Sequence, residues 1–359
     1  MLLYWLHSLS GTVGVFNVFR YISFRAITAA LTAMILMLIV TPWAIRKLRY
    51  YQIGQYIQED GPASHKSKAG TPTMGGAIIL FAVAVSTLLW ANLEIYYIWV
   101  CLLVMLGLGL VGFLDDYRKL IKKQNQGLTA KEKFIYQIGI TFLAGLMLVL
   151  YPKYPLYLSI PFIKGWSPYL GIFYIPFSML VVIGASNAVN LSDGLDGLAI
   201  GPVIVASVTY LIFSYLAGHV RIASYLQLPS ITGAGELAVF CGAIIGAGTG
   251  FLWFNSYPAQ VFMGDVGSLA LGGSLGIVAT VTKQELLLVL VGGIFVIEAL
   301  SVIAQVGFFK LTHGKRIFRM APLHHHFELK GWAEPKVSVR FWIIAFILSL
   351  LSIATLKLR

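Results

Sequence analysis

Residues 95–116 read IYYIWVCLLVMLGLGLVGFLDD, in which twenty uncharged and largely apolar residues are followed at once by Asp115 and Asp116. A helix needs about 20 such residues to cross the hydrocarbon core of a bilayer, which is ~30 Å thick. The stretch therefore predicts a membrane-spanning helix that carries two carboxylates at one end.

Nine other apolar runs of similar length predict an all-α, polytopic integral membrane protein with about ten transmembrane helices. The expected spans are 26–45, 74–93, 95–114, 134–151, 169–187, 198–217, 237–254, 266–282, 286–309 and 341–356. The composition agrees, because 58% of the residues are hydrophobic and only 11% are charged, whereas about 25% are charged in soluble domains. An ordinary soluble enzyme, a disordered chain and a disulfide scaffold are excluded.

Charged residues concentrate in the five odd-numbered loops between these spans, which are 46–73, 115–133, 188–197, 255–265 and 310–340. These loops contain 18 of the 26 Lys and Arg residues, so the positive-inside rule makes them cytoplasmic and makes both termini external, or periplasmic. Ten of the 14 acidic residues, including every Asp, lie there too. Residues 1–359 are expected to form a single transmembrane domain whose cytoplasmic loops make the active-site face. The net charge of +12 then indicates contact with lipid headgroups rather than nucleic acid.

Asp115 and Asp116 are the first of five polar constellations on this face. Neighbouring residues on a helix point about 100° apart, so the two carboxylates are not expected to face the same way. They would divide two roles, one near a metal ion and one as a proton acceptor. A solvated helix end is the alternative interpretation.

The second and third constellations contain no Lys or Arg. The second, NAVNLSDGLDG at 187–197, has two Asp-Gly pairs and spaces Asn190, Asp193 and Asp196 three residues apart, so that they would align if the segment coils. The third, NSYPAQVFMGDVGS at 255–268, places Asp265 directly before a span. The second pattern suits metal or nucleotide binding, and the glycines of the third allow a phosphate or metal to approach the backbone. A capped turn is the alternative for the second and a helix N-cap for the third.

The fourth constellation is the histidine run at 324–326, and the fifth is the loop DGPASHKSKAGTPTMGG at 60–76. The histidines suit hydrogen bonding to phosphate or sugar, or proton transfer. Zinc is the alternative there, although no cysteine lies nearby. The loop has the donors, cations and glycines of a phosphate-binding surface without the order of a P-loop, and a solvated basic loop is its alternative. Together the five constellations favour Mg²⁺ or Mn²⁺ and phosphoryl transfer between one lipidic and one water-soluble substrate.

These motifs together resemble one family, the polyprenyl-phosphate N-acetylhexosamine-1-phosphate transferases, over nearly the whole chain. The resemblance rests on DGPASHKSKAGTPTMGG at 60–76, GFLDDYRK at 112–119, NAVNLSDGLDGLA at 187–199, FNSYPAQVFMGDVGSLALGG at 254–273 and RIFRMAPLHHHFELKGW at 316–332. The histidine run makes the chain more similar to the muramoyl-pentapeptide branch than to relatives that use UDP-N-acetylglucosamine.

The resemblance implies a reaction in peptidoglycan synthesis, in which UDP-MurNAc-pentapeptide and undecaprenyl phosphate give lipid I and UMP. It implies a Mg²⁺ cofactor, with Mn²⁺ as a substitute. It also implies helices around a cytoplasmic cleft in the bacterial inner membrane, usually in a homodimer.

Carried over residue by residue, the resemblance also implies roles for single side chains. Asp265 is the leading metal ligand, with Asn190 as a second. Asp115 is the base on the lipid phosphate, and Asp116 supports the metal and phosphate region. His324 completes the catalytic set. The expected substrate-binding residues are Lys68, Thr73, Lys119, Asn187, Asp193, Asp196, Asn255, Phe262, His325 and His326.

Several alternatives stay open. Direct attack by the lipid phosphate is favoured over a phospho-aspartyl intermediate, because that phosphate is already an anionic nucleophile. A sister enzyme that transfers GlcNAc-1-phosphate, a transporter and a lipid-binding scaffold are the competing functions. Glu298 is the only acid inside a predicted span, and we interpret it as structural because one carboxylate does not make a proton relay.

Overall fold

Helices dominate the computed structural model, which describes residues 14–50, 70–122, 127–161, 163 and 166–357. Within these ranges no strand forms, and Tyr157 and Tyr169 make an isolated antiparallel bridge. The helices are η2 (Gly14–Arg20), α2 (Ile22–Tyr50), α3 (Gly76–Trp90), α4 (Tyr96–Lys122), α5 (Ala130–Leu150), η4 (Gly171–Phe173), α6 (Tyr174–Ser192), α7 (Ile200–Ala217), α8 (Val220–Leu226), η5 (Ala234–Glu236), α9 (Leu237–Asn255), α10 (Gly264–Val281), α11 (Leu288–Val291), α12 (Gly293–Leu311), α13 (Leu323–Glu328), α14 (Glu334–Ala354) and η6 (Thr355–Lys357).

The predicted all-α membrane fold is confirmed. In the described part of the chain, nine helices are long and apolar enough to cross a membrane, and each coincides with a predicted span. The tenth predicted run contains α3, which has 15 residues. Gly292 divides the predicted span 286–309 into the short helix α11 and the long helix α12.

Helices extend into all five predicted loops, and they extend furthest into 115–133, 188–197 and 310–340. α4 continues to Lys122, α6 continues to Ser192, and α14 already begins at Glu334. Hydropathy indicates only the part of a helix that contacts lipid. The helix itself continues wherever the following polar residues have sufficient helix propensity. The helices therefore continue beyond the apolar spans, and much of the polar face is built from helix ends.

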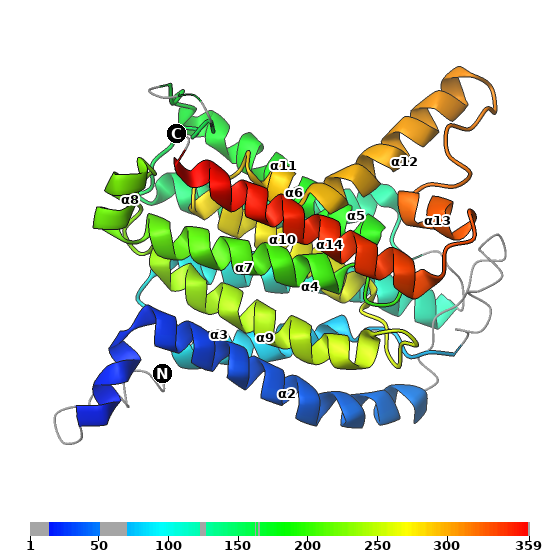
Figure 1. The fold of residues 1–359 in the computed structure, drawn as a ribbon, viewed down its shortest axis with the longest axis horizontal. Coiled ribbons are helices and arrows are strands. Elements are labelled where there is room, and N and C mark those ends of the chain that lie inside the picture. The colour runs from blue at the N-terminus through cyan, green and yellow to red at the C-terminus, as the bar shows by residue number, and fades with distance from the viewer. Residues whose placement is uncertain (1–13, 51–69, 123–126, 162, 164–165, 358–359) are drawn as a thin grey trace.

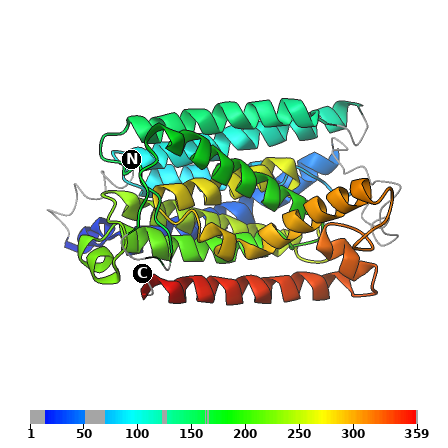
Figure 2. The same ribbon diagram turned by 90° about the horizontal axis from the view of Figure 1, so that it is seen from above.

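α10 is the central helix of the bundle, and all its residues from Val266 to Val281 are buried. Figures 1 and 2 show it in the interior, where it packs mainly against α4 and α6. Its many glycine, alanine and serine residues let the neighbouring helices approach closely. One such close approach is at Gly112 of α4, where a β-carbon would lie 2.2 Å from the backbone oxygen of Asp265. This contact sets the spacing between the end of α4 and the start of α10.

The long helices run between two ends of the molecule. η2, α8 and the C-terminal end of α14 lie at one end, and α13 lies at the other (Figure 1). A hydrogen bond from Lys357 Nζ to the backbone oxygen of Tyr225, over 3.1 Å, joins the C-terminal segment to α8. The first described helix, η2, and the C-terminal end of α14 thus lie at the same end of the bundle, which agrees with an even number of spans between them.

Candidate active site at the α13 end of the bundle

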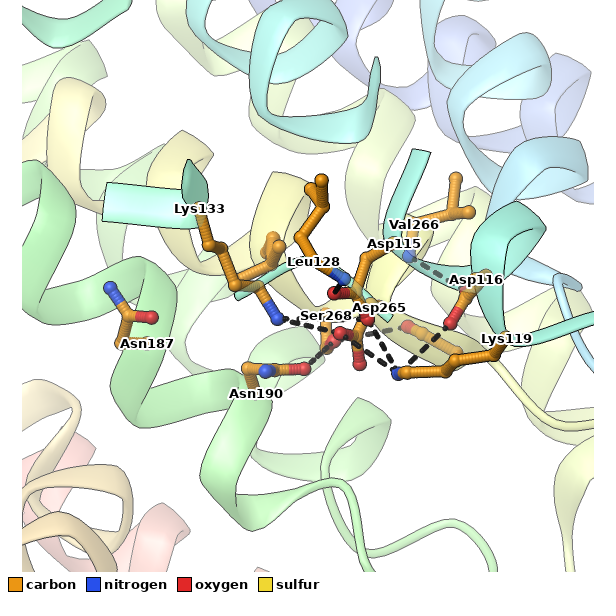
Figure 3. A network of polar contacts seen from close by, with 12 residues as sticks. Asp115, Asp116, Lys119, Leu128, Lys133, Asn187, Asn190, Asp265, Val266 and Ser268 are labelled. Atoms are coloured by element: carbon orange, nitrogen blue, oxygen red, sulfur yellow. Dashed lines mark hydrogen bonds and ion pairs between the residues drawn. The ribbon is translucent and has the colours of Figure 1, made fainter. Parts of the chain in front are cut away.

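Three carboxylates meet where α4 ends and α10 begins. Asp115 and Asp116 lie near the C-terminus of α4, and Asp265 lies in the first turn of α10. One oxygen of each lies within 4.8 Å of the others, and Figure 3 shows the three side chains converging. Among the described residues, this is the one group of acidic, His or Cys side chains with the spacing of metal ligands.

Two lysine ammonium groups lie among these carboxylates (Figure 3). Lys119 Nζ is 2.6 Å from Asp115 Oδ2 and 3.4 Å from Asp116 Oδ1, and it is 3.3 Å from Oδ2 of Asp265. Lys133 of α5 places its Nζ 2.6 Å from the same oxygen of Asp265. The sequence pattern indicated Lys119 as a site residue but not Lys133, because a lysine in a basic segment gives no signal beyond its charge.

Backbone N–H groups orient the two acids of α4. Leu128 N donates to Asp115 Oδ1 over 2.8 Å, and Val266 N donates to Asp116 Oδ2 over 3.4 Å. The expectation that neighbouring carboxylates cannot face the same way is wrong at the level of their oxygens, since both reach the ammonium of Lys119. The two Cα–Cβ bonds point in different directions, but rotation about the side-chain bonds brings both carboxylates to the same ammonium group.

Asn190 and Asn187 lie beside this cluster near the end of α6 (Figure 3). Asn190 Oδ1 accepts a hydrogen bond from Ser268 Oγ of α10 over 2.6 Å. Asn187 Nδ2 donates to Gln137 Oε1 of α5 over 2.9 Å, and Gln137 returns a bond of 3.4 Å. These amides join α5, α6 and α10 around the carboxylates, through Ser268 and Gln137, for which the sequence pattern indicated no role.

The turn at 193–197 connects α6 to α7 and does not form the predicted coil. Asp193 leaves the helical conformation with φ −85° and ψ 56°, and Gly197 has φ +70°. Two Asp-Gly pairs favour such turns over a helix. The helical alignment of Asn190, Asp193 and Asp196 is therefore wrong, since Asn190 is helical and the two acids lie in the turn.

The two acids of this turn differ in their surroundings. Asp196 is buried, and its Oδ2 accepts from Ala259 N over 2.9 Å. Asp193 is partly exposed, and its carboxylate makes no hydrogen bond or ion pair to the part of the chain that the structure describes. Loss of solvent around its carboxylate, followed by the negative charges of Asp265, Asp116 and Asp196, raises the pKa of Asp193 to about 8.

Asn255 is buried beneath the same turn. Its Oδ1 accepts from Gly197 N over 3.0 Å, and its Nδ2 donates to the backbone oxygen of Val261 over 2.9 Å. The oxygen and the nitrogen of this side-chain amide, which was predicted to bind substrate, therefore both bond within the protein. They join the turn to the segment before α10.

The segment that contains Thr73 pairs with the segment that contains Phe262, next to the start of α10. Phe262 N donates to the oxygen of Pro72, and Gly75 N donates to the oxygen of Phe262, each over 2.8 Å. Two predicted substrate-binding residues that are far apart in the sequence thus lie together. Lys68 lies outside the described residues.

His324 is buried against Glu298 of α12. The backbone N of His324 donates to Glu298 Oε1 over 3.1 Å, and its Nδ1 is 3.3 Å from Oε2. Burial lowers the pKa of His324, and Glu298 opposes this change. Nε2 has no hydrogen-bond partner and faces Gly194 of the acidic turn, where a β-carbon would lie 2.3 Å from it. The acid that we interpreted as structural is thus a partner of a predicted catalytic residue.

His325 and His326 have other partners. His325 Nδ1 is 2.8 Å from Glu328 Oε2, and His326 Nδ1 accepts from Arg319 N over 3.1 Å. Burial, with the nearby cations Lys330 and Arg319, lowers the pKa of His326. Because the Nδ1 atoms of the three histidines face three separate groups, the run does not form a shared zinc centre in this arrangement.

The fold and the site are those of a membrane-embedded transferase, and a family model described as glycosyl transferase family 4 matches residues 98–283. That match extends from α4 through α10 and includes all three carboxylates. The chain belongs to the phospho-N-acetylmuramoyl-pentapeptide-transferase family, whose signature 1 matches residues 68–80.

Relatives with this name match over the full length of both chains. The phospho-N-acetylmuramoyl-pentapeptide-transferase of Syntrophus aciditrophicus (strain SB) is 61% identical over 359 residues, which is 100% of each chain. Those of Desulforapulum autotrophicum and Pelobacter propionicus are each 58% identical over 359 residues, again 100% of each chain. The predicted family resemblance and the muramoyl-pentapeptide branch are confirmed.

Proposed function

We propose that this protein transfers phospho-MurNAc-pentapeptide from UDP-MurNAc-pentapeptide to undecaprenyl phosphate, giving lipid I and UMP for peptidoglycan synthesis. An oxygen of the lipid phosphate attacks the β-phosphorus of the nucleotide, and the bond from that phosphorus to UMP breaks. The observation that carries the proposal is the cluster of Asp115, Asp116 and Asp265, with two lysines, at the end of an apolar helix bundle. The names of the full-length relatives supply the substrate class.

The carboxylate cluster fits a Mg²⁺ cofactor. Mg²⁺ prefers hard oxygen ligands and is commonly held by one or two carboxylates together with phosphate oxygens. Asp265 would hold it, with Asp115 and Asp116 close enough to share it and Asn190 as a further candidate ligand. When bound, the ion would neutralise charge on the diphosphate.

The lysines and the acids of α4 would orient the lipid phosphate. Lys119 and Lys133 supply two positive charges that favour a phosphate beside the carboxylates. We assign Asp115 as the proton acceptor. Its Oδ1 accepts from Leu128 N, whereas its Oδ2 lies 2.6 Å from Lys119 Nζ, one of the two cations that would bind the lipid phosphate. Direct attack needs no covalent aspartyl intermediate, and Asp116 would act by supporting the phosphate region.

The neutral and acidic groups around the 193–197 turn would bind the nucleotide donor. Asp193 offers a carboxylate without a protein partner among the described residues, and Phe262 offers an aromatic ring for stacking on uracil. His324, with His325 and His326 beside it, would contact the diphosphate or the sugar. Thr73, Lys68 and Asn187 are the remaining proposed contacts.

The proposal is tested by UMP release from purified protein in detergent, with undecaprenyl phosphate and UDP-MurNAc-pentapeptide. We expect release that requires Mg²⁺ and that falls by at least about 10³-fold in Asp265→Asn. Glu94→Gln is the matched control, because Glu94 is exposed in the connection between α3 and α4. Metal-independent release, or Asp265→Asn activity close to wild type in folded protein, would refute the assignment. Equal use of UDP-GlcNAc would favour the sister activity instead.

We also propose that the α13 end faces the cytoplasm of the bacterial inner membrane, on the strength of the Lys and Arg distribution. Glu94→Cys and Lys315→Cys, treated in intact spheroplasts with a membrane-impermeant thiol reagent, test this proposal. The native Cys101 and Cys241 are buried, so labelling should report the new thiols. Labelling at 94 and protection at 315 are expected, and the reverse pattern would invert the topology.

The molar mass of the detergent-solubilised protein tests the proposed homodimer.

A further inference from the structure

One face of α14 bonds to the backbone of the 193–197 turn. Glu334, Ser338 and Trp342 follow one another at intervals of four residues, so they line one stripe of the helix. Asp196 N donates to Glu334 Oε1 over 2.7 Å, and Ser338 Oγ donates to the backbone oxygen of Asp196 over 3.1 Å. Trp342 Nε1 donates to the backbone oxygen of Gly197 over 3.0 Å.

A second stripe of α14 buries the apolar side chains of the same turn. Leu195 and Leu198 lie in a small hydrophobic cluster with Val337, Phe341 and Ala345 of α14. The pattern DGLDGL at 193–198 thus has a physical reason. Its leucines pack into α14, while its aspartates and glycines make the turn. A hydrogen-bonding stripe and an apolar stripe of one helix therefore hold one turn.

The opposite side of the turn is held by the segment before α10. Ala259 N donates to Asp196 Oδ2 over 2.9 Å, and Gly197 N donates to Asn255 Oδ1 over 3.0 Å. Residues 196–197 are thus bonded on two sides, whereas Asp193 keeps a carboxylate without a partner in the described chain. The buried and unpartnered Nε2 of His324 faces Gly194. The turn therefore has a fixed half and a half that is available to a ligand.

The chemistry of the available half suits the nucleotide more than the lipid phosphate. A carboxyl group without a protein partner hydrogen-bonds to the hydroxyl and N–H groups of a nucleoside in either protonation state. The two lysines that would attract the lipid phosphate lie on α4 and α5 instead. Loosening the fixed half should make the turn more mobile, and the donor would then lose affinity because binding must order the turn.

We propose that Glu334, Ser338 and Trp342 are positioning residues that set the affinity for the nucleotide donor through the 193–197 turn. The inference rests on the proposed function for the identity of the donor. None of the three needs to touch substrate, since their bonds end on the protein backbone.

The test compares Ser338→Ala and Trp342→Phe with wild type in the full-length protein. Each variant removes one hydrogen-bond donor, and each is expected to raise KM for UDP-MurNAc-pentapeptide about fivefold, the effect of about 1 kcal/mol. We expect kcat and the KM for undecaprenyl phosphate to stay within about twofold of wild type. Ser338→Thr, which keeps the hydroxyl, should restore the donor KM.

Ser349→Ala is the matched control. Ser349 is also a buried serine of α14, but its hydroxyl bonds to Thr209 of α7, far along the helix from the turn. A donor KM that rises as much in Ser349→Ala as in Ser338→Ala would overturn the inference, because it would reveal only a general dependence on α14 packing. A donor KM that is unchanged in folded Ser338→Ala and Trp342→Phe would overturn it as well.

UMP binding, measured by calorimetry without lipid, provides a readout that does not depend on turnover. About fivefold weaker binding to Ser338→Ala than to wild type supports the inference whichever sugar the donor carries. Equal binding to the two proteins overturns it. Failure of wild type to release UMP would instead refute the proposed function, so the two failures are distinguishable.

Discussion

Substitution of Gly112 by Ala should damage catalysis much more than stability. The new β-carbon would lie 2.2 Å from the backbone oxygen of Asp265, 2.4 Å from its carbonyl carbon and 2.5 Å from Val266 N. Ordinary contacts of a β-carbon begin at 3.4 Å. The clashing atoms belong to the backbones of two packed helices, so a single atom cannot move aside to remove the clash. Instead α4 and α10 must separate by about 1 Å, which moves Asp115 and Asp116 away from Asp265.

The consequences for activity and stability can be weighed separately. A misplacement of ~1 Å at a reacting centre costs about 100-fold in rate. Overpacking of this kind costs about 1–3 kcal/mol of stability, and the higher helix propensity of alanine returns about 1 kcal/mol. We therefore expect UMP release to fall about 100-fold, while a large part of the population stays folded.

The assay measures initial UMP release at saturating substrates, beside thermal unfolding followed by fluorescence. Gly139→Ala in α5 is the control, because a β-carbon there would meet nothing within 4 Å. It should retain near wild-type activity. If folded Gly112→Ala releases UMP within about threefold of wild type, the spacing of α4 and α10 does not control the site, and the reasoning fails.

Two further predictions concern buried ionisable side chains. Lys283 is buried beneath Tyr174 with Glu285 3.8 Å away, and burial lowers its pKa to about 7. Between this pKa and its ordinary value near 10.5, the unfolded chain binds more protons than the folded one. Stability should then rise with pH above about 7, by up to ~1.4 kcal/mol per unit. Between pH 6.5 and 8.5 the melting temperature of wild type should therefore rise relative to that of Lys283→Met. A difference in melting temperature that does not change with pH would count against the buried position of Lys283. Glu298→Gln should keep the fold but reorient His324, lowering kcat about 10- to 100-fold; an unchanged kcat would show that His324 does not depend on this carboxylate.

The sequence predicted the spans well because lipid contact leaves a direct trace in composition. It predicted their polar ends poorly. The helix that carries Asp115 and Asp116 continues to Lys122, and α14 begins seven residues before its predicted span at 341. At these ends hydropathy falls while backbone hydrogen bonding continues, so the apolar run underestimates the helix.

The candidate site was predictable where its residues were chemically unusual for their setting. Asp265 and the acidic pair of α4 stand out as carboxylates beside apolar runs. Lys133 did not, because basic residues are expected in any cytoplasmic segment. Ser338 and Trp342 could not be predicted for another reason. The expected boundary at 341 places Ser338 in a loop and Trp342 in a membrane span, whereas their role depends on which stripe of the single helix α14 meets the 193–197 turn.

Hydropathy also failed to distinguish the central helix from the peripheral ones, since both are apolar. The distinction lies in side-chain size. α10 is rich in glycine, alanine and serine and is buried along its length, whereas α12 and α14 present residues such as Ile303 and Phe346 outward. A helix enclosed by protein has little freedom to tilt, so its first turn is the fixed point of the site. Asp265 lies in that turn, where the helix dipole favours a negative charge. The acids of α4 are then placed relative to Asp265 by the contact at Gly112, which explains why one backbone spacing controls the geometry of all three carboxylates.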